Sequence, residues 1–323
     1  MEKSNGKEDN LILGRELLMR FFKEVKAWIL LSRLPFHLVG ILPFITGSIL
    51  YLKITKTFNF PVFLLGAIGV VLIMLSTYYN GEIHDIEEDR LSVKLEKNFF
   101  SAGSQVLVDG LISSKRVKLV SYVAIGSAFF IGLLLQFYYK TGPWTIPLGI
   151  TGIITGFYYS KPPFRWVKRG VGELLIGYSY GWLPVAVGFY LQAGFIHPLA
   201  HWISLPIACS IFNVILINEF PDYPADMQVN KNNLVVKYGK VKATAIYIAA
   251  TIIGITSFII SLTKGLPLIT GLFYTPIGIL SFVAIWMVLE GRFNDHCLLE
   301  RTCLITLLIN LGTCLVYIIG LLV

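Results

Sequence analysis

The feature that most limits how this chain can fold is a series of long apolar stretches separated by short polar segments. About nine stretches of roughly 20 residues follow one another, and a stretch of that length spans the hydrocarbon core of a bilayer as an α-helix. Only 14% of the residues are charged, against about 25% in a typical soluble domain. We therefore expect an all-α, multi-spanning integral membrane protein. The predicted spans are 27–52, 61–80, 118–139, 143–160, 171–195, 202–220, 243–263, 267–290 and 302–323.

The short polar segments carry most of the positive charge on one side of the predicted membrane. If the polar segment 1–26 is placed in the cytoplasm, the segments on that side hold 21 lysines and arginines and the opposite loops hold four. Cytoplasmic loops of membrane proteins carry such an excess, so we expect a cytoplasmic N-terminus and an external C-terminus. This bias explains the net charge of +8, so we expect no nucleic-acid partner. The chain shows no targeting pattern, which is compatible with a prokaryotic plasma membrane.

Two acidic motifs follow the second and sixth predicted spans, so both are expected to face the cytoplasm. Each has the spacing Glu-x-x-Asp-x-x-x-Asp, and equivalent aspartates are 137 residues apart. A carboxylate cluster at the edge of a membrane is costly and is usually functional. The matched motifs therefore predict one site built from two halves of the chain. The residues are Glu82, Asp85 and Asp89 in the first motif, and Glu219, Asp222 and Asp226 in the second.

Carboxylates gathered in one site require compensating cations. Hard oxygen ligands favour Mg²⁺, Ca²⁺ or Mn²⁺, and Mg²⁺ usually binds one or two carboxylates together with substrate phosphates. We therefore expect Mg²⁺ to bridge the motifs and a diphosphate. If the second helix continues past Asn80, Asp85 and Asp89 share one of its faces. Pro221 and Pro224 predict an interruption of the other helix, which would leave its carboxylates on a turn or a new helical start.

Other polar residues near the same predicted face are candidate substrate ligands. The segment 97–110 has the serine and glycine content of an anion-binding loop, and the segment 158–169 carries a basic rim. An ionisable residue inside an apolar stretch is expected to face the protein interior, and an arginine there to pair with an anion or a carboxylate. Each residue also has a simpler interpretation as a turn, a positive-inside charge or a solvated acid. The candidates are Arg33, Glu82, Ser101, Lys161, Arg165, Glu173, Asn218 and Lys231.

At these residues the chain resembles the UbiA superfamily of intramembrane aromatic prenyltransferases. The segment 218–226 (NEFPDYPAD), with 231–239 (KNNLVVKYG) after it, carries the resemblance most specifically. The segments 158–164 (YYSKPPF) and 168–185 (KRGVGELLIGYSYGWLPV) look most like the branch that prenylates 1,4-dihydroxy-2-naphthoate in menaquinone biosynthesis.

The resemblance implies one transmembrane prenyltransferase domain over 27–323. This domain would transfer an isoprenyl chain from a polyprenyl diphosphate to an aromatic acceptor, with Mg²⁺ assisting departure of the diphosphate. The family's first motif usually has an asparagine four residues before its first aspartate, a place that Gly81 takes here. The implied catalytic and metal-binding residues are Asp85, Asp89, Asp222 and Asp226, assisted by Asn80 and Asn218.

Alternatives remain for both the acceptor and the class of protein. Relatives use 4-hydroxybenzoate, homogentisate, haem, chlorophyllide or a glycerophospholipid precursor as acceptor. A cation-coupled transporter would be expected to carry its acids near the bilayer midplane at broken helices, whereas these acids lie at helix ends. A membrane scaffold would not explain two matched motifs on one face.

Overall fold

The computed structural model describes residues 5–95 and 103–323, without the side chains of 5–14, 16 and 92–95. Within these ranges all regular structure is helical, which confirms the all-α prediction. The helices are α1 (Asn5–Leu31), α2 (Leu38–Thr55), α3 (Phe60–His84), α4 (Ile86–Leu95), α5 (Ser114–Leu133), α6 (Thr145–Phe157), α7 (Gly172–Ile176), α8 (Leu183–Ala193), α9 (Pro198–Gln228), α10 (Leu234–Thr263), α11 (Ile269–Leu289) and α12 (His296–Leu322).

Eight helical stretches in the described residues are long and apolar enough to cross a membrane. The remaining predicted span, 143–160, contains the shorter apolar helix α6, which has 13 residues. The predicted first span, 27–52, is not one continuous helix, because the chain breaks between α1 and α2. Arg33 has a left-handed backbone there (φ 47°), and Pro35 cannot continue the hydrogen-bond ladder of α1.

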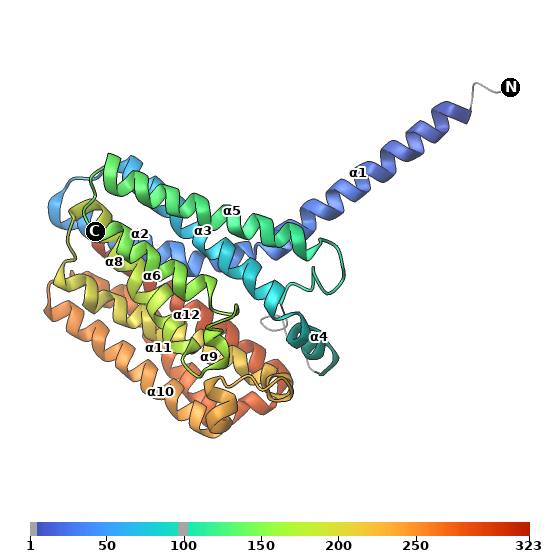
Figure 1. The fold of residues 1–323 in the computed structure, drawn as a ribbon. Coiled ribbons are helices and arrows are strands. Elements are labelled where there is room, and N and C mark those ends of the chain that lie inside the picture. Colours follow the sequence, from blue (N-terminus) through green and yellow to red (C-terminus); the bar gives the residue numbers. More distant parts are fainter. Residues whose placement is uncertain (1–4, 96–102) are drawn as a thin grey trace.

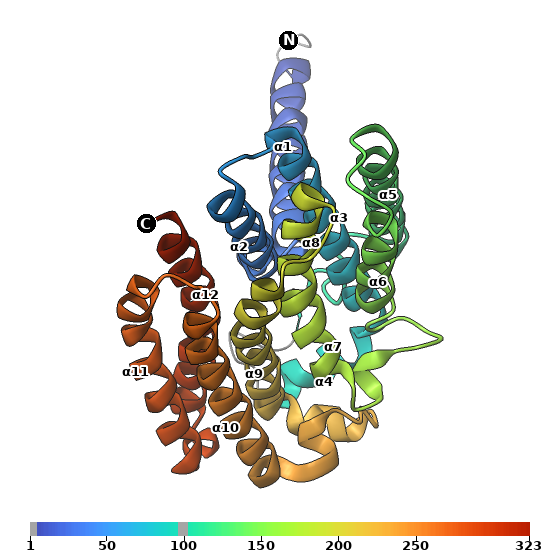
Figure 2. The same ribbon diagram turned by 90° about the vertical axis from the view of Figure 1, so that its left-hand side faces the viewer.

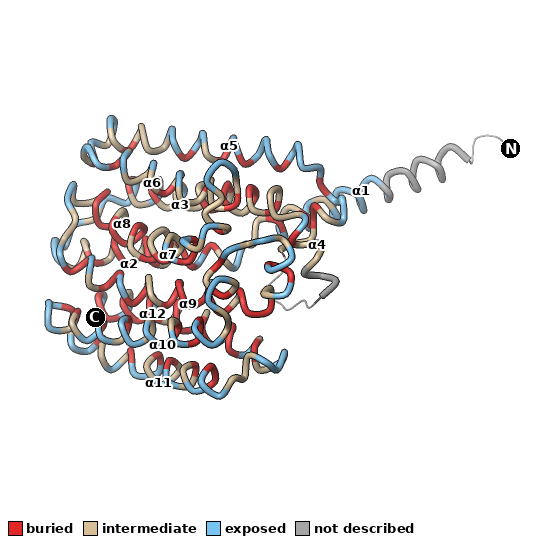
Figure 3. The backbone as a smooth tube through the Cα atoms, turned by 60° about the horizontal axis from the view of Figure 1, so that its bottom comes forward, coloured by how far each residue is buried: buried red, intermediate tan, exposed pale blue. Residues whose placement is uncertain are grey.

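The long helix α9 lies at the centre of the bundle. It packs against α10 and α12 on one side and against α7 and the π-helical turn Gly177–Trp182 on the other. Helices α3 and α5 form a second packed pair, and α2 packs on α8 and α12. Figure 2 shows α10, α11 and α12 on one side of the molecule and α3, α5 and α6 on the other. The tube in Figure 3 shows burial concentrated in the helices between these outer groups.

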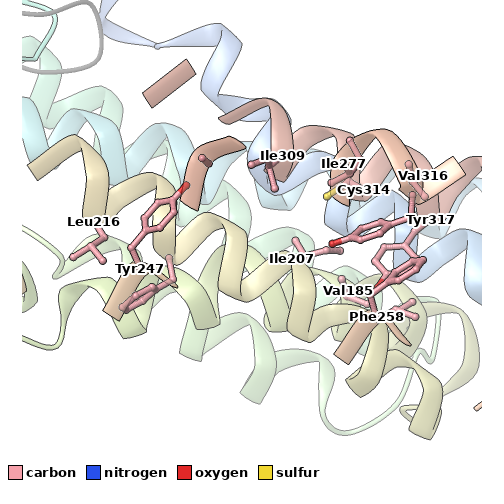
Figure 4. Close-up of a cluster of buried hydrophobic side chains, with 14 of the residues drawn as sticks. Val185, Ile207, Leu216, Tyr247, Phe258, Ile277, Ile309, Cys314, Val316 and Tyr317 are labelled. Atoms are coloured by element: carbon pink, nitrogen blue, oxygen red, sulfur yellow. The ribbon is translucent and has the colours of Figure 1, made fainter. Parts of the chain in front are cut away.

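The largest cluster of buried apolar side chains fills the space among α9, α10, α11 and α12 (Figure 4). Two of its tyrosines, Tyr247 and Tyr317, are at most 1% exposed. The Tyr247 hydroxyl lies 2.7 Å from Thr306 Oγ1, so its polar end has a partner, as a buried tyrosine requires. This half of the bundle therefore gives α9 a rigid support.

Helix α9 is continuous to Gln228 although it contains three prolines, so the expected interruption at Pro221 and Pro224 is wrong. Pro221 has no N–H, which leaves the carbonyl of Ile217 without its helical donor. The Cys303 thiol on α12 lies 3.9 Å from that oxygen and supplies a weak donor. Neighbouring helices commonly satisfy backbone groups that a proline frees in a membrane helix. The second acidic motif is consequently held on a helix rather than on a turn.

Candidate active site

A cavity of about 260 Å³ lies where α3, α4 and α9 meet, at the end of the bundle that carries α4 (Figure 1). Both acidic motifs line it, so two segments 137 residues apart in the sequence face one space. Eight of the predicted site residues contribute to its wall: Arg33, Asp85, Asp89, Asn218, Glu219, Asp222, Asp226 and Lys231.

The first motif sits at a helix break rather than on a continuous helix. Helix α3 ends at His84, Asp85 has φ −107° and ψ 13°, and α4 begins at Ile86. The helix therefore continues past Asn80, but it ends before Asp85 rather than running on to Asp89. The Asp89 N–H still donates to the Asp85 carbonyl at 2.8 Å, so one helical turn joins the two aspartates and both reach the cavity.

The carboxyl group of Asp85 is fixed by residues from the segment after α6. Ser160 Oγ donates a hydrogen bond to Asp85 Oδ2 at 2.6 Å, and Arg165 Nη2 lies 3.8 Å from Asp85 Oδ1. Burial, reinforced by the nearby Glu88, raises the pKa of Asp85 to about 7. Burial and the charge of Glu82 likewise raise the pKa of Asp89 to about 8. Both groups would be stabilised in their ionised form by an added cation.

Glu82 has a structural environment that differs from that of its two neighbouring aspartates. Arg33 donates to Glu82 Oε1 from Nη2 at 2.7 Å and from Nε at 3.2 Å. The backbone N–H and the hydroxyl of Ser104 donate to Oε1 and Oε2 at 2.8 and 2.7 Å. These contacts use both oxygens, so Glu82 ties Arg33 and the loop at Ser104 to α3. The interior carboxylate partner expected for Arg33 is thus Glu82.

Gly103, next to Ser104, packs directly against the Asp89 carboxylate. Its backbone has φ 57°, and a β-carbon on it would overlap the carboxylate oxygens. Only glycine adopts this conformation without cost while allowing such a close approach. The close contact of Gly103 therefore positions Asp89. The serine and glycine content of this segment indicated an anion-binding loop but did not indicate which glycine would lie against the site.

Glu88 belongs to the same acidic cluster, although the sequence reasoning missed it. Its side chain is 6% exposed, and Lys168 Nζ and Arg165 Nη2 lie 2.5 and 3.5 Å from Oε1. These ion pairs attach the basic rim of 158–169 to α4. Glu88 is not part of the Glu-x-x-Asp-x-x-x-Asp spacing. It lies three residues after Asp85, however, and side chains three residues apart on a helix are neighbours, so this position could have indicated that Glu88 belongs to the site.

The second motif is held by the segment that links α9 to α10. Asp226 accepts hydrogen bonds from Lys231 Nζ at 3.2 Å and from Asn233 Nδ2 at 2.7 Å. Asn233 also caps α10, since its Oδ1 accepts the Val236 N–H at 2.8 Å. Glu173 Oε1 accepts the Leu234 N–H at 2.5 Å. Glu173 therefore supports this segment from α7 and does not itself line the cavity.

The structure does not bring five predicted ligands to the cavity wall, and one lies outside the described residues. Asn80 donates to the Ser76 carbonyl and to Ser121 Oγ, both at 3.0 Å, facing α5. Lys161 donates to the Tyr122 hydroxyl at 2.7 Å and stands over the ring of Phe157. Glu82 and Arg165 contact Arg33 and Glu88, which do line the cavity, and Glu173 holds Leu234 as described above. Ser101 belongs to the segment that is not described.

The oxygen ligands around the cavity fit a hard divalent cation that is bound by the protein and a phosphate group together. Asp85 Oδ1 and Asn218 Oδ1 are buried and have no hydrogen-bond partner among the described residues. In the part of the chain that is described, no group of three or more His, Cys, Asp or Glu side chains is arranged to hold a metal by itself. Mg²⁺ commonly binds one or two carboxylates and completes its shell with substrate phosphates and water.

A second cavity, about 120 Å³ and mostly apolar, adjoins the acidic one. Thr77 and Tyr180 line both cavities, so the two meet at these side chains. The apolar cavity lies among α3, α5, α6 and α8, and several glycines widen it. The site therefore combines an acidic compartment at the bundle end with an apolar compartment inside the bundle.

Residues 40–299 match the UbiA prenyltransferase family. The chain belongs to this family. The matched range contains both acidic motifs and most of the cavity wall.

Three curated relatives are similar over part of their lengths. The UbiA prenyltransferase domain-containing protein 1 of Dictyostelium discoideum is 28% identical over 134 residues, 40% of each chain. The 2-carboxy-1,4-naphthoquinone phytyltransferase of Synechocystis sp. is 26% identical over 220 residues, 66% of each chain. The 1,4-dihydroxy-2-naphthoate octaprenyltransferase of Escherichia coli is 31% identical over 138 residues, 41% of this chain and 39% of that one. The alignment thus spans less than two thirds of each relative.

Solved structures of UbiA homologues share the fold. The apo structure of a homologue from Aeropyrum pernix has a TM-score of 0.66 at 17% identity, covering 88% of this chain and 97% of that one. A homologue from Archaeoglobus fulgidus, solved bound to DMAPP and Mg²⁺, has a TM-score of 0.60 at 15% identity, covering 90% and 98%.

Proposed function

We propose that this protein transfers a prenyl chain from a polyprenyl diphosphate to an aromatic acceptor, and that the acceptor is 1,4-dihydroxy-2-naphthoate, as in menaquinone biosynthesis. The observation that carries the proposal is the single cavity lined by both acidic motifs, with Arg33 and Lys231 in the same wall. Two carboxylate pairs and two cationic side chains match a diphosphate accompanied by divalent cations. The adjoining apolar cavity matches a hydrocarbon chain attached to that diphosphate.

The roles of the residues follow from their positions. Asp85, Asp89, Asp222 and Asp226 would hold Mg²⁺, which when bound neutralises charge on the departing diphosphate. Arg33 and Lys231 donate hydrogen bonds to phosphate oxygens, and Asn218 offers its buried amide to the same group. Ser160 and Gly103 position the two aspartates of the first motif, as described above. These residues act together on the leaving group, where negative charge develops as the carbon–oxygen bond breaks.

The apolar cavity has a second role in this proposal. It places the prenyl chain among α3, α5, α6 and α8 and excludes water from the carbon that reacts. The aromatic side chains Tyr78, Tyr159 and Tyr180 line the acidic cavity, and Tyr180 lines both cavities. In this proposal their ring faces stabilise a developing allylic cation. The electron-rich ring of the acceptor attacks this carbon and then loses a proton.

The choice of acceptor rests on the relatives whose names contain naphthoate or naphthoquinone substrates. We further propose that the site faces the cytoplasm of a prokaryotic plasma membrane. The excess of lysine and arginine on the side of the acidic motifs supports this orientation.

The test uses membranes that contain the full chain, Mg²⁺, a set of prenyl diphosphates and a panel of aromatic acceptors, with products identified by mass spectrometry. We expect a prenylated product of 1,4-dihydroxy-2-naphthoate. Asp85→Asn and Asp222→Asn should each lower turnover by about 100-fold or more, since several kcal/mol of charge stabilisation are lost.

The matched control is Asp109→Asn, because Asp109 is exposed and does not line the cavity. It should keep full activity. If a different acceptor is prenylated, the proposed reaction is supported but 1,4-dihydroxy-2-naphthoate is not the acceptor. Near-normal turnover in folded Asp85→Asn or Asp222→Asn would contradict the two-motif site, and no consumption of any donor by folded protein would contradict the reaction itself.

A further inference from the structure

The amino-terminal helix α1 extends away from the bundle (Figure 1). Its carboxyl-terminal end is packed, with Ala27 and Leu31 at most 1% exposed beside residues of α3 and α5. Between Arg15 and Lys23, by contrast, every described side chain is exposed. Leu17, Phe21 and Phe22 are 58, 62 and 61% exposed. A helix with such side chains needs an apolar environment that lies outside the bundle.

The residues of this helix separate into two faces. At 100° per residue, the large apolar side chains other than Met19 fall within one arc and the charged side chains within the opposite one. The apolar face contains Leu17, Leu18, Phe21, Phe22, Val25, Trp28 and Ile29. The charged face contains Arg15, Glu16, Arg20, Lys23, Glu24 and Lys26. Basic amphipathic helices with this arrangement lie in the interface of a bilayer.

The length of the first apolar stretch also indicates that α1 does not cross the membrane with α2. The stretch Leu17–Thr55 has 39 residues, or about 58 Å of helix at about 1.5 Å per residue, nearly twice the thickness of a hydrocarbon core. The part after the break, 34–55, is long enough for one crossing. The chain changes direction at the break at Arg33. Residues 34–55 therefore make the crossing, and residues 15–29 lie outside the span.

We propose that residues 15–29 of α1 lie on the bilayer surface, on the side of the acidic cavity, with the apolar face among the acyl chains and the basic face toward anionic headgroups. The side follows from Arg33, which comes two residues after α1 and lines that cavity. Charge decides the partner. Four of the six charged residues on this face are basic, and Glu24, one of the two acidic residues, is paired with Arg116. A second copy of this chain, with net charge +8, would be repelled, whereas an anionic lipid surface attracts.

The experiment uses the full chain in vesicles of phosphatidylcholine with or without phosphatidylglycerol. Cys209→Ser and Cys297→Ser remove the more accessible thiols, since Cys303 and Cys314 are buried. A nitroxide is then attached to a single new cysteine at Phe21→Cys or, as the matched control on the charged face, at Lys23→Cys. Collision with oxygen reports lipid exposure, and collision with a nickel chelate reports water exposure.

We expect the label at position 21 to be accessible to oxygen and shielded from nickel, and the label at position 23 to show the reverse. Phosphatidylglycerol should increase the shielding at position 21, and the triple change R20Q, K23Q and K26Q should remove that increase. Nickel access at both positions would overturn the proposal by showing a helix in water. Shielding of position 21 from both reagents would overturn it by showing a protein cover. An unchanged signal with phosphatidylglycerol would overturn the assignment of an anionic partner.

Discussion

The ammonium group of Lys231 lies 3.2 Å from Asp226 Oδ1, inside the cavity that the first acidic motif also lines. Burial alone would lower the pKa of Lys231, but the carboxylates of Asp226, Asp85 and Asp222 raise it well above its usual value. The charge of this one lysine thus acts on both motifs. Without a divalent cation, Lys231 compensates carboxylates that would otherwise repel one another.

Replacing Lys231 with methionine should make the protein dependent on Mg²⁺ for its stability. Removing one partner of a buried ion pair costs about 3 kcal/mol when the other charge stays buried, and an added divalent cation can replace the lost charge. We expect a lower unfolding temperature without Mg²⁺ and a larger Mg²⁺-induced rise than in the parent protein. The control is Lys237→Met, an exposed lysine on α10. Equal Mg²⁺-induced rises in the parent and in Lys231→Met would contradict this role.

The requirement for Mg²⁺ should fall as the pH rises. The pKa of Asp85 is raised to about 7 and that of Asp89 to about 8, so both carboxyls are mostly protonated at low pH, whereas a metal ligand must be deprotonated. Each proton that Mg²⁺ displaces weakens apparent binding up to about tenfold per pH unit below the pKa. We expect the Mg²⁺ concentration for half-maximal activity to decrease between about pH 6 and pH 8.5. An Asp89→Asn variant with residual activity should show a shallower dependence, and a flat profile in the parent would count against these carboxyls as ligands.

Gly103→Ala should disturb the site through Asp89. The added β-carbon would overlap the Asp89 carboxylate, and the residue also has a positive φ of 57°. Gly110→Ala provides the control, because Gly110 has a φ of 68° and nothing within 4 Å of the added carbon. Both variants carry the same kind of backbone strain, about 1 kcal/mol. We expect only Gly103→Ala to raise the Mg²⁺ concentration for half-maximal activity, by about tenfold or more. Similar kinetics in the two variants would show that Gly103 serves only the turn.

The sequence predicted those parts of the structure that depend on length and spacing along the chain. Apolar stretches of sufficient length form helices in the structure. The equal spacing of the motifs that contain Asp85 and Asp222 predicted that the two motifs share one site. Helix α9 shows the limit of this reasoning. Pro221 argues locally for a break, but Cys303, distant in the chain, supplies a donor for the freed carbonyl. No local pattern contains that compensation.

The same limit explains which candidate ligands do not reach the cavity. Glu82 has the spacing of a ligand, yet Arg33 and Ser104 use both of its oxygens. Asn80 lies one residue away from the position at which the family pattern places an asparagine, and on a helix one residue is about 100°. Its amide consequently faces Ser121 on α5. Which face of a helix points into a site is decided by tertiary packing, so the residue type alone does not determine its role.

The apolar cavity should limit the length of prenyl chain that the enzyme accepts. Gly132 on α5 lines this cavity, and a β-carbon placed on it meets nothing within 4 Å. A leucine at this position would therefore project into the space assigned to the prenyl chain without disturbing the helix packing. Gly126, on the same helix, also has nothing within 4 Å of an added carbon but does not line the cavity. Gly126→Leu is accordingly the matched control for any general effect of replacing glycine on α5.

We expect Gly132→Leu to keep activity with geranyl diphosphate and to lose about tenfold or more in kcat/KM with a long polyprenyl diphosphate, because the leucine overlaps only the distal part of the chain. Gly126→Leu should have the same kcat/KM as the parent protein with both donors. Measuring kcat/KM for the two donors in all three proteins tests this directly. An equal loss for both donors would place Gly132 beside the reacting end of the chain. No loss for either, in folded protein that retains transferase activity, would show that the prenyl chain leaves the acidic cavity by another route.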